Sequence, residues 1–199
     1  MGCMSVQLYL ASRSPRRARF LEQLGLRFEI LTADVPEQPL PGQSPRDYAL
    51  ATAVAKAEAA ARLAPLPLPV LGADTDVSID GEILGKPRDR ADALAMLERL
   101  SRRSHEVCSA VAVIAGGRRA TAVTVTRVSF GAITAAQAAA YWESGEPADK
   151  AGAYAIQGYA ARWVQSIEGS YSGVVGLPLY QTCELLQRCG VSCGDEFAA

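Results

Sequence analysis

Strand and helix signals alternate along this chain of 199 residues, and the alternation restricts its fold more than any other feature. Short apolar runs typical of strands are followed by longer segments with helical periodicity and recognisable capping residues. Alternation of this kind favours an α/β fold, in which helices pack on a sheet. The chain contains no long linker, repeat or low-complexity tract, so we expect one compact domain with a cleft between two lobes.

The expected elements follow from hydrophobic periodicity and from capping and turn residues. Strands are expected over residues 6–11, 27–31, 68–73, 106–115 and 118–130, with a short hairpin over 77–84 that turns at Asp80-Gly81. Helices are expected over residues 15–24, 44–63, 89–100, 134–144 and 178–188. Gly116-Gly117 between two strand-like runs predicts a second hairpin. The acidic, proline-rich segment 34–43 predicts a loop.

The first strand runs into a turn that gathers hydroxyl and guanidinium groups at the start of a helix. Ser14 suits the N-cap position and Pro15 the first helical position. Arg16 and Arg17 then lie in the first turn, where the helix dipole disfavours positive charge, and no acidic residue follows before Glu22. Backbone N–H and guanidinium groups at one helix start suit a phosphate ligand. The segment therefore predicts a phosphate site, with a solvated basic turn as the alternative.

A carboxylate follows a buried strand near residue 70. Asp74 comes directly after the apolar run 70–73, at what we expect to be the strand end, where ligands bind in α/β sheets. A carboxylate there suits a hard cation such as Mg²⁺ or the orientation of an attacking water, and a turn-capping aspartate is the alternative. Asp76 lies two residues further. If the strand continues, the two carboxylates share one face and repel each other unless a cation or proton lies between them.

Four further polar residues are weaker candidates. Glu37 lies in the loop 34–43, where a plain surface acid is also expected. Lys56 lies in the alanine-rich helix, where lysines are usually solvated, whereas Lys86 lies in a turn that the following proline constrains and suits a phosphate. Gln157 offers a donor and an acceptor, so it could read the edge of a base.

Composition and charge argue against several classes of protein. Lys and Arg number 20 and Asp and Glu 21, a balance that disfavours a non-specific nucleic-acid binder. No segment approaches the roughly 20 apolar residues of a membrane span, and the N-terminus lacks the pattern of a signal peptide, so we expect a cytoplasmic protein. The segment 169–173 resembles a nucleophile elbow with tyrosine in the central place, but His105 is the single histidine. We therefore expect no Ser-His-Asp hydrolase and a structural or surface role for His105.

Several segments, in this order, resemble the Maf family, the septum-formation-inhibitor-like nucleoside triphosphate pyrophosphatases. The resemblance covers residues 8–186, and it is carried by 11–17 (ASRSPRR), 72–75 (GADT), 85–87 (GKP), 149–158 (DKAGAYAIQG), 169–171 (GSY) and 174–179 (VVGLPL). The sequence of residues 150–158 is similar to that of the branch that acts on dTTP and UTP, and it differs from that of the branch that acts on 7-methyl-GTP.

The resemblance implies a fold and an activity. The fold would be a single Maf/ITPase-like α/β domain over residues 5–190, a mixed twisted β-sheet flanked by helices, followed by a C-terminal tail over 191–199. The activity would be hydrolysis of the α–β phosphoanhydride of dTTP, UTP or modified pyrimidine nucleotides to the monophosphate and pyrophosphate. A divalent cation, Mg²⁺ or Mn²⁺, would be the cofactor. The protein would be a cytoplasmic homodimer with a nucleoside triphosphate as its ligand and without nucleic-acid or membrane partners.

Site residues carry over position by position. Asp74, as general base, with Glu37 and Lys86 would be catalytic, and Glu37 and Asp74 would also bind the metal. The residues that would bind the substrate are Ser12, Arg16, Arg17, Lys56 and Gln157.

The chain departs from the usual family sequence mildly at Ser172-Gly173 and at three further places. Arg13 replaces a glycine and adds bulk and charge to the phosphate turn, Ala155 replaces a glycine beside Gln157, and Asp76 replaces an aliphatic residue. Asp76 either adds a metal contact or perturbs Asp74. Two other functions stay open: a nucleotide-binding regulator of cell division with incidental catalysis, and the same fold acting on a purine triphosphate such as ITP.

Overall fold

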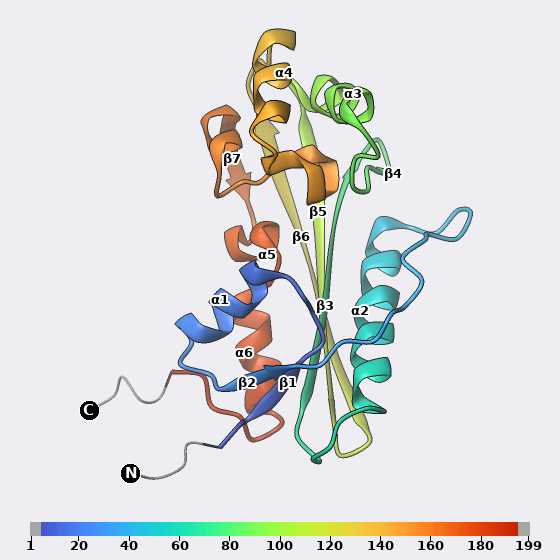
Figure 1. The fold of residues 1–199 in the computed structure, drawn as a ribbon, viewed down its shortest axis with the longest axis vertical. Helices are drawn as coiled ribbons and strands as arrows, with labels where there is room; N and C mark the ends of the chain where they lie inside the picture. The colour runs from blue at the N-terminus through green and yellow to red at the C-terminus, as the bar shows by residue number, and fades with distance from the viewer. Residues whose placement is uncertain (1–4, 195–199) are drawn as a thin grey trace.

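In residues 5–194, the part of the chain that the computed structural model describes, seven strands form one mixed sheet (Figure 1). The strand order is β2-β1-β3-β5-β6-β7, and β4 pairs with β3 outside this path. β1 pairs in parallel with β2 and β3, whereas the pairs β3–β4, β3–β5, β5–β6 and β6–β7 are antiparallel. The α/β fold with a mixed sheet is therefore confirmed. The strands are β1 (Leu8–Leu10), β2 (Phe28–Ile30), β3 (Val70–Ile79), β4 (Glu82–Ile83), β5 (Ser104–Ala115), β6 (Arg118–Phe130) and β7 (Val164–Glu168).

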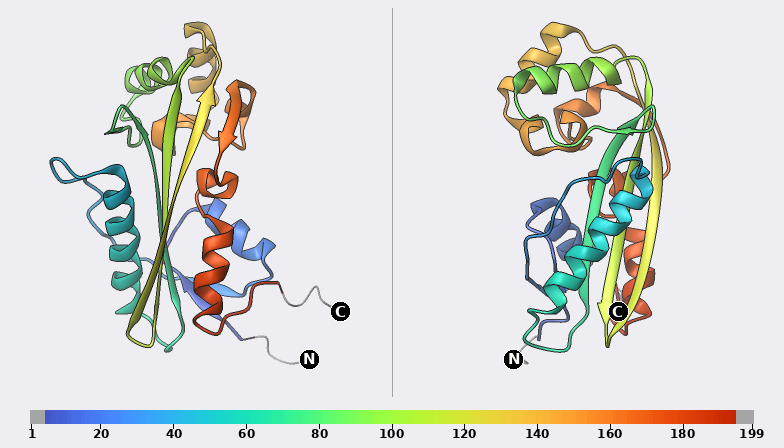
Figure 2. Two further views of the ribbon diagram at one scale, coloured as in Figure 1. Left: turned by 180° about the vertical axis from the view of Figure 1, so that it is seen from behind. Right: turned by 90° about the vertical axis from the view of Figure 1, so that its right-hand side faces the viewer.

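Helices cover both faces of the sheet and its upper end. α1 and α6 lie on one face and α2 lies on the other, while α3 and α4 lie beside the upper part of the long strands (Figures 1 and 2). The α-helices are α1 (Pro15–Gln23), α2 (Pro45–Ala61), α3 (Arg90–Leu100), α4 (Ala135–Glu143), α5 (Tyr171–Val175) and α6 (Leu179–Gln187). Three 3₁₀ segments follow α4: η1 (Glu146–Asp149), η2 (Ala151–Ala153) and η3 (Tyr159–Trp163).

The long strands β3, β5 and β6 run through two lobes. The lower lobe contains β1, β2, α1, α2 and α6, and the upper lobe contains α3, α4, β4 and the 3₁₀ segments (Figure 2). β5 and β6 have 12 and 13 residues and are joined at Gly116 and Gly117, which have φ of 55° and 74°. Positive φ at both turn residues is what a two-residue type I′ hairpin requires, so the predicted hairpin is confirmed.

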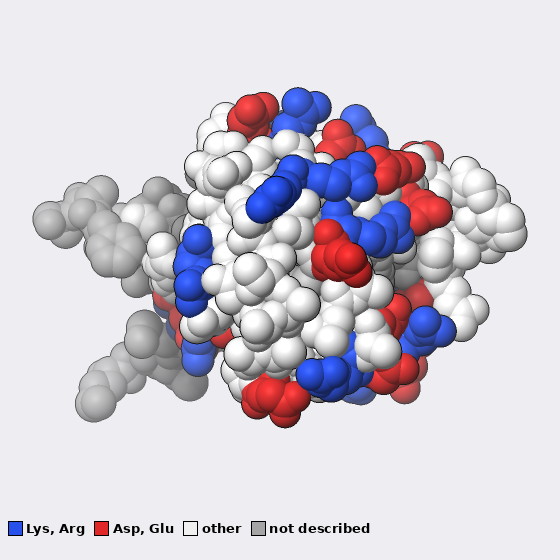
Figure 3. Space-filling model, turned by 90° about the horizontal axis from the view of Figure 1, so that it is seen from above, with Lys and Arg blue, Asp and Glu red and all other residues white. Residues whose placement is uncertain are grey.

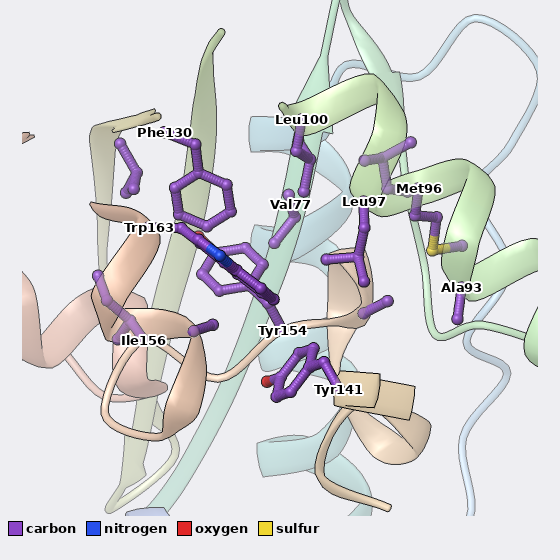
Figure 4. Packing of buried hydrophobic residues seen from close by; sticks show 14 of the residues in the cluster. Val77, Ala93, Met96, Leu97, Leu100, Phe130, Tyr141, Tyr154, Ile156 and Trp163 are labelled. Carbon is purple, nitrogen blue, oxygen red and sulfur yellow. The ribbon is translucent and has the colours of Figure 1, made fainter. Parts of the chain in front are cut away.

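Each lobe has its own apolar core. The upper core packs aromatic rings from the sheet, α4 and the 3₁₀ segments, with Trp163 lying edge-on to Tyr141 at 5.2 Å between ring centroids (Figure 4). The lower core joins β1, α1 and α6, and Leu8, Leu21 and Leu186 are fully buried in it. The cleft between the lobes is thus bounded by two separately packed units on one sheet.

Helix α2 lies unusually close to the sheet because small residues line both sides. Ala49, Ala53 and Ala57 of α2 form a buried cluster with alanines of β5. Gly72 of β3 lies beneath this helix, and a Cβ atom there would come within 2.4 Å of the Ala53 carbonyl oxygen. The close approach fixes the position of α2, which begins after the side chain of Ser44 accepts a capping hydrogen bond from the Asp47 N–H.

The sequence-based element boundaries were wrong at one place that matters for the site. A strand ending at residue 73 was predicted, but β3 continues from Val70 to Ile79 and pairs with β5 throughout. Asp74 therefore lies in the middle of a strand rather than at its end. The turn at Asp80-Gly81 is confirmed, with φ of 55° and 79°. β7 and the 3₁₀ segments were not predicted.

The two chain ends are only partly described. Residues 1–4, part of the N-terminus that argued against a signal peptide, lie outside the described residues, as do residues 195–199 of the expected tail. Val191 is buried against the lower core. Within residues 5–194, no helix has both the length and the apolar character needed to cross a membrane.

Candidate active site

A cavity of about 790 Å³ opens between the two lobes. Its walls come from the β1–α1 turn, the loop before α2, α2 itself, β3, the turn after β4 and the segment 149–157. Every residue that the sequence placed in the site lines this cavity: Ser12, Arg16, Arg17, Glu37, Lys56, Asp74, Lys86 and Gln157. Residues far apart in the sequence therefore meet in one cleft.

On the face seen from above, several basic side chains lie beside acidic ones (Figure 3). Ion pairs such as Arg103–Asp80 at 2.6 Å and Arg99–Glu82 at 2.7 Å account for part of this pattern. Within residues 5–194, six basic residues line the cleft itself: Arg13, Arg16, Arg17, Lys56, Lys86 and Lys150.

The β1–α1 turn holds Arg17 in a fixed orientation. The Arg17 guanidinium donates from Nε to the Gly176 carbonyl oxygen at 2.8 Å and from Nη1 to the Ser12 hydroxyl oxygen at 3.0 Å. Arg17 is only 9% exposed, and burial lowers its pKa while the charge of Asp74 partly offsets that effect. Ser14 stands at the N-cap, as predicted, but its side chain makes no capping hydrogen bond. A preset guanidinium at a helix start matches the predicted phosphate site.

Arg16 and Arg13 point to different surroundings. Arg16 lies 3.8 Å from a carboxylate oxygen of Asp149, a residue of the upper lobe, so this ion pair bridges the cleft. Arg13 donates to the Thr32 hydroxyl at 3.2 Å and pairs with Asp34 at 3.6 Å on the exposed surface. The additional arginine of the turn is thus held by neighbouring loop residues.

Lys56 forms ion pairs with two carboxylates of the cleft. Its Nζ lies 2.6 Å from Glu37 Oε1 and 2.6 Å from Asp74 Oδ1, and its side chain is 15% exposed. Burial acts to raise the pKa of Glu37, but the hydrogen bond and charge of Lys56 outweigh it and hold that pKa below its usual value. Lys56 is therefore not the solvated helix lysine that its sequence surroundings suggested. Its ammonium joins the loop before α2 to the middle of β3.

Asp76 shares the cleft face of β3 with Asp74, as the continuation of the strand requires. Its side chain is 7% exposed, and its Oδ2 atom has no hydrogen-bond partner among the described residues. Burial raises the pKa of Asp76 to about 8, and the charge of Asp74 and a hydrogen bond to it add to the shift. The same two carboxyl groups, together with burial, raise the pKa of Tyr48 to about 12.

The upper lobe supplies Lys86 and the segment around Gln157. The turn that carries Lys86 is held from behind, because the Gly152 N–H donates to the Gly85 carbonyl oxygen at 2.9 Å. Gly152 has φ of 67°, and a Cβ there would come within 2.8 Å of Val77, which explains the need for glycine. Gln157 is exposed at the cavity rim, directly after the buried Ile156.

Some participants were missed from the sequence. The Gly176 carbonyl that holds Arg17 and the Asp149 that pairs with Arg16 lie more than a hundred residues from their partners, and no local pattern points to such contacts. Tyr154 also lines the cavity, and its hydroxyl lies 2.8 Å from Nε2 of His105 in a hydrogen bond. His105 is buried, and burial lowers its pKa to about 4, in agreement with the structural role expected for it.

The fold and the cleft define an α/β protein in which a basic turn at a helix start faces a cluster of buried acidic and basic side chains. The profile of the family described as Maf-like protein matches residues 7–189. The chain belongs to the Maf family.

Two relatives of similar length agree with this assignment. A dTTP/UTP pyrophosphatase of Methylobacillus flagellatus is 49% identical over 96% of this chain and 97% of its own length. A dTTP/UTP pyrophosphatase of Bordetella avium is 50% identical over 94% of this chain and 96% of its own length. Among solved structures, a nucleoside-triphosphatase / dITP/XTP pyrophosphatase from Mycobacterium abscessus covers 62% of this chain and 73% of its own at 21% identity, with a TM-score of 0.42.

Proposed function

We propose that this protein is a metal-dependent nucleoside triphosphate pyrophosphatase that hydrolyses the α–β phosphoanhydride of dTTP or UTP. One observation carries the proposal: the Ser12–Arg17 turn and the Glu37–Lys56–Asp74 cluster line the same cleft. The names of the relatives, at about half identity over nearly the whole chain, support the pyrimidine substrate.

Arg17, Arg16 and Lys86 have different roles in the proposed binding of the triphosphate. Arg17, fixed by Ser12 and Gly176, keeps its position before the ligand arrives, so little conformational entropy is lost on binding. Arg16 exchanges its long ion pair with Asp149 for the triphosphate, and Lys86 adds positive charge from the opposite lobe. Neutralising and positioning the phosphate chain is the main requirement for phosphoryl transfer.

Asp74 is the proposed general base. It accepts a proton from the attacking water, the water oxygen bonds to phosphorus, and the bridging P–O bond breaks to leave the monophosphate and pyrophosphate. Lys56 holds one carboxylate oxygen of Asp74 at 2.6 Å, which fixes the orientation of the carboxyl group. Gln157 at the rim is placed to contact the base or sugar of the substrate.

The donor set fits a hard divalent cation. Carboxylate oxygens are the ligands that Mg²⁺ and Mn²⁺ prefer, and the carboxylates of Glu37, Asp74 and Asp76 line the cleft. The family resemblance implies Glu37 and Asp74 as the ligands. A bound cation would neutralise phosphate charge in the transition state.

Turnover of a nucleotide panel tests the proposal. We expect dTTP or UTP with Mg²⁺ or Mn²⁺ to give monophosphate and pyrophosphate, resolved by ion-pair chromatography, while CTP, GTP, ITP and 7-methyl-GTP react slowly. Asp74→Asn should bind dTTP but lose nearly all turnover. Asp80→Asn, an exposed aspartate on the same hairpin, is the matched control and should keep it. Preference for ITP would move the assignment to a purine triphosphatase, and tight binding without turnover to a nucleotide-binding regulator.

We further propose, from the family resemblance, that the protein is a cytoplasmic homodimer that binds neither nucleic acid nor membranes. Light scattering coupled to size-exclusion chromatography measures the mass directly, against 21.0 kDa for one chain. A monomer at all concentrations would refute the dimer and leave the proposed activity untouched.

A further inference from the structure

The proposed reaction assigns no role to one buried carboxyl group of the cleft, that of Asp76. Asp76 lines the cavity, is 7% exposed, and has one oxygen, Oδ2, without a hydrogen-bond partner among the described residues. Buried carboxyl groups are normally paired with a cation or fully hydrogen-bonded, because removal from water is costly. An unpartnered oxygen at this position therefore points to a ligand that completes it.

No basic side chain takes that part. Within residues 5–194, the ion pairs of the cleft use Lys56 for Glu37 and Asp74, and none of them includes Asp76. Burial and the neighbouring charge of Asp74 raise the pKa of Asp76, and the β3–β5 register sets Asp76 opposite Cys108, which supplies no charge. The charges of Lys56 and Arg17 act on Asp76 without a direct contact, so Asp76 is a buried acid of this face that has no ion-pair partner among the described residues.

The position of Lys56 distinguishes two pairs of carboxylates that could share a cation: Glu37 with Asp74, and Asp74 with Asp76. Its Nζ lies 2.6 Å from both Glu37 and Asp74 and fills the space between these carboxylates. Among the described residues, no three acidic, histidine or cysteine side chains converge on one point that could hold a metal ion. A cation shared by Asp74 and Asp76 needs no displacement of Lys56, whereas a cation shared by Glu37 and Asp74 does.

We propose that Asp74 and Asp76 together hold the divalent cation, that the Asp76 carboxylate is one of its ligands, and that Glu37 instead positions Lys56. The inference rests on the proposed function for its purpose, since the cation would serve the triphosphate bound beside it. Two carboxylates complemented by substrate phosphates and water are the usual surroundings of Mg²⁺ in enzymes that act on nucleotides. Glu37 is then a positioning residue, and Asp76 is a specific metal ligand of this chain.

Binding of Mn²⁺ without nucleotide tests the inference, measured from the electron paramagnetic resonance signal of free Mn²⁺ at increasing metal concentration. We expect Asp76→Asn to weaken Mn²⁺ binding by about tenfold or more. Mutation of residues that only hydrogen-bond to metal ligands already lowers metal affinity by about tenfold, and loss of a direct ligand should cost at least as much. Asp76→Val removes the same oxygens and replaces them by a side chain that suits a buried strand, so it should show the same loss. Asp80→Asn, which removes the same charge on the exposed end of the hairpin, should bind Mn²⁺ as the wild type does.

Glu37→Gln separates the two possible pairs. We expect it to keep Mn²⁺ affinity within about twofold while turnover falls, because it loosens Lys56 rather than the cation. Wild-type Mn²⁺ affinity in both Asp76 variants would overturn the inference, as would a loss confined to Glu37→Gln.

The outcome is independent of the proposed activity. If the wild type hydrolyses no nucleotide and Asp76→Asn still loses Mn²⁺, the proposed function fails and the cation site stands. If dTTP is hydrolysed and both Asp76 variants bind Mn²⁺ normally, the function stands and this inference fails. Circular dichroism of each variant confirms that folded proteins are compared.

Discussion

Replacing Gly72 with alanine would test whether the contact between α2 and β3 sets the distance between Lys56 and Asp74. An ideal Cβ at Gly72 lies 2.4 Å from the Ala53 carbonyl oxygen, 2.7 Å from the Ala57 nitrogen and 2.8 Å from its Cβ. Ordinary contacts of carbon lie at about 3.5 Å or beyond, so α2 has to move away from the sheet by about 1 Å. No flexible side chain can yield instead, because the nearest atoms belong to the helix backbone.

Two effects follow from that displacement. Overpacking of a well-packed interior costs about 1–3 kcal/mol, and for a chain of this length each kcal/mol lowers Tm by about 2–4 °C, which gives a fall of about 2–12 °C. The same movement lengthens the 2.6 Å contact between Lys56 Nζ and Asp74 Oδ1 beyond hydrogen-bonding distance. A displacement of about 1 Å in a catalytic group can lower turnover by about a hundredfold.

Calorimetry and dTTP turnover on the same preparation measure both effects. Gly131→Ala is the control, since its Cβ would meet only the Gln165 side chain, at 3.5 Å and beyond. The control should keep wild-type turnover and melt within about 2 °C of the wild type. A Gly72→Ala protein with unchanged Tm and turnover would refute the claim that this contact positions Lys56.

For three further substitutions the structure predicts the direction of the change in stability. Burial lowers the pKa of His105 from 6.5 to about 4, so the unfolded chain takes up a proton first as the pH falls, and the native state loses about 2–3 kcal/mol between about pH 7 and 4.5. The free energy of unfolding of His105→Gln, measured by urea titration, should fall less between about pH 7 and 4.5 than that of the wild type. Asp76→Val should raise metal-free stability by about 1–3 kcal/mol, because it removes an unpartnered buried oxygen, and a lowered Tm would contradict this. Ser44→Ala should cost about 1 kcal/mol in urea unfolding through loss of the α2 cap, and an unchanged midpoint would show that the cap is dispensable.

Local chemistry explains which parts of the fold the sequence predicts. The caps at Ser44, Asp89 and Thr134 each act on a backbone N–H three residues away, so their helices begin where expected. The hairpin at Gly116-Gly117 is equally local. β3 is different, because Asp74 and Asp76 are poor strand formers and only the pairing with β5 keeps them in the strand.

The same distinction applies to the site. Arg17 was predicted from its place at a helix start, and the structure shows it bound to Gly176, which is 159 residues away. Lys56 looks like a solvated helix residue in the sequence because the carboxylates that bind it come from a loop and a strand outside its helix. Residue types in this cleft can be recognised locally, whereas their partners depend on the tertiary fold.

The three long strands determine how the protein can be divided. β3, β5 and β6 each give one end to the lower lobe and the other end to the upper lobe, so neither lobe is a continuous stretch of chain (Figure 2). A truncation that removes one lobe cuts each of the long strands β3, β5 and β6, so the remaining lobe keeps only part of each strand. Neither half of the cleft is therefore available as a separate fragment, and exchange of one lobe between relatives has to be made within the strands themselves.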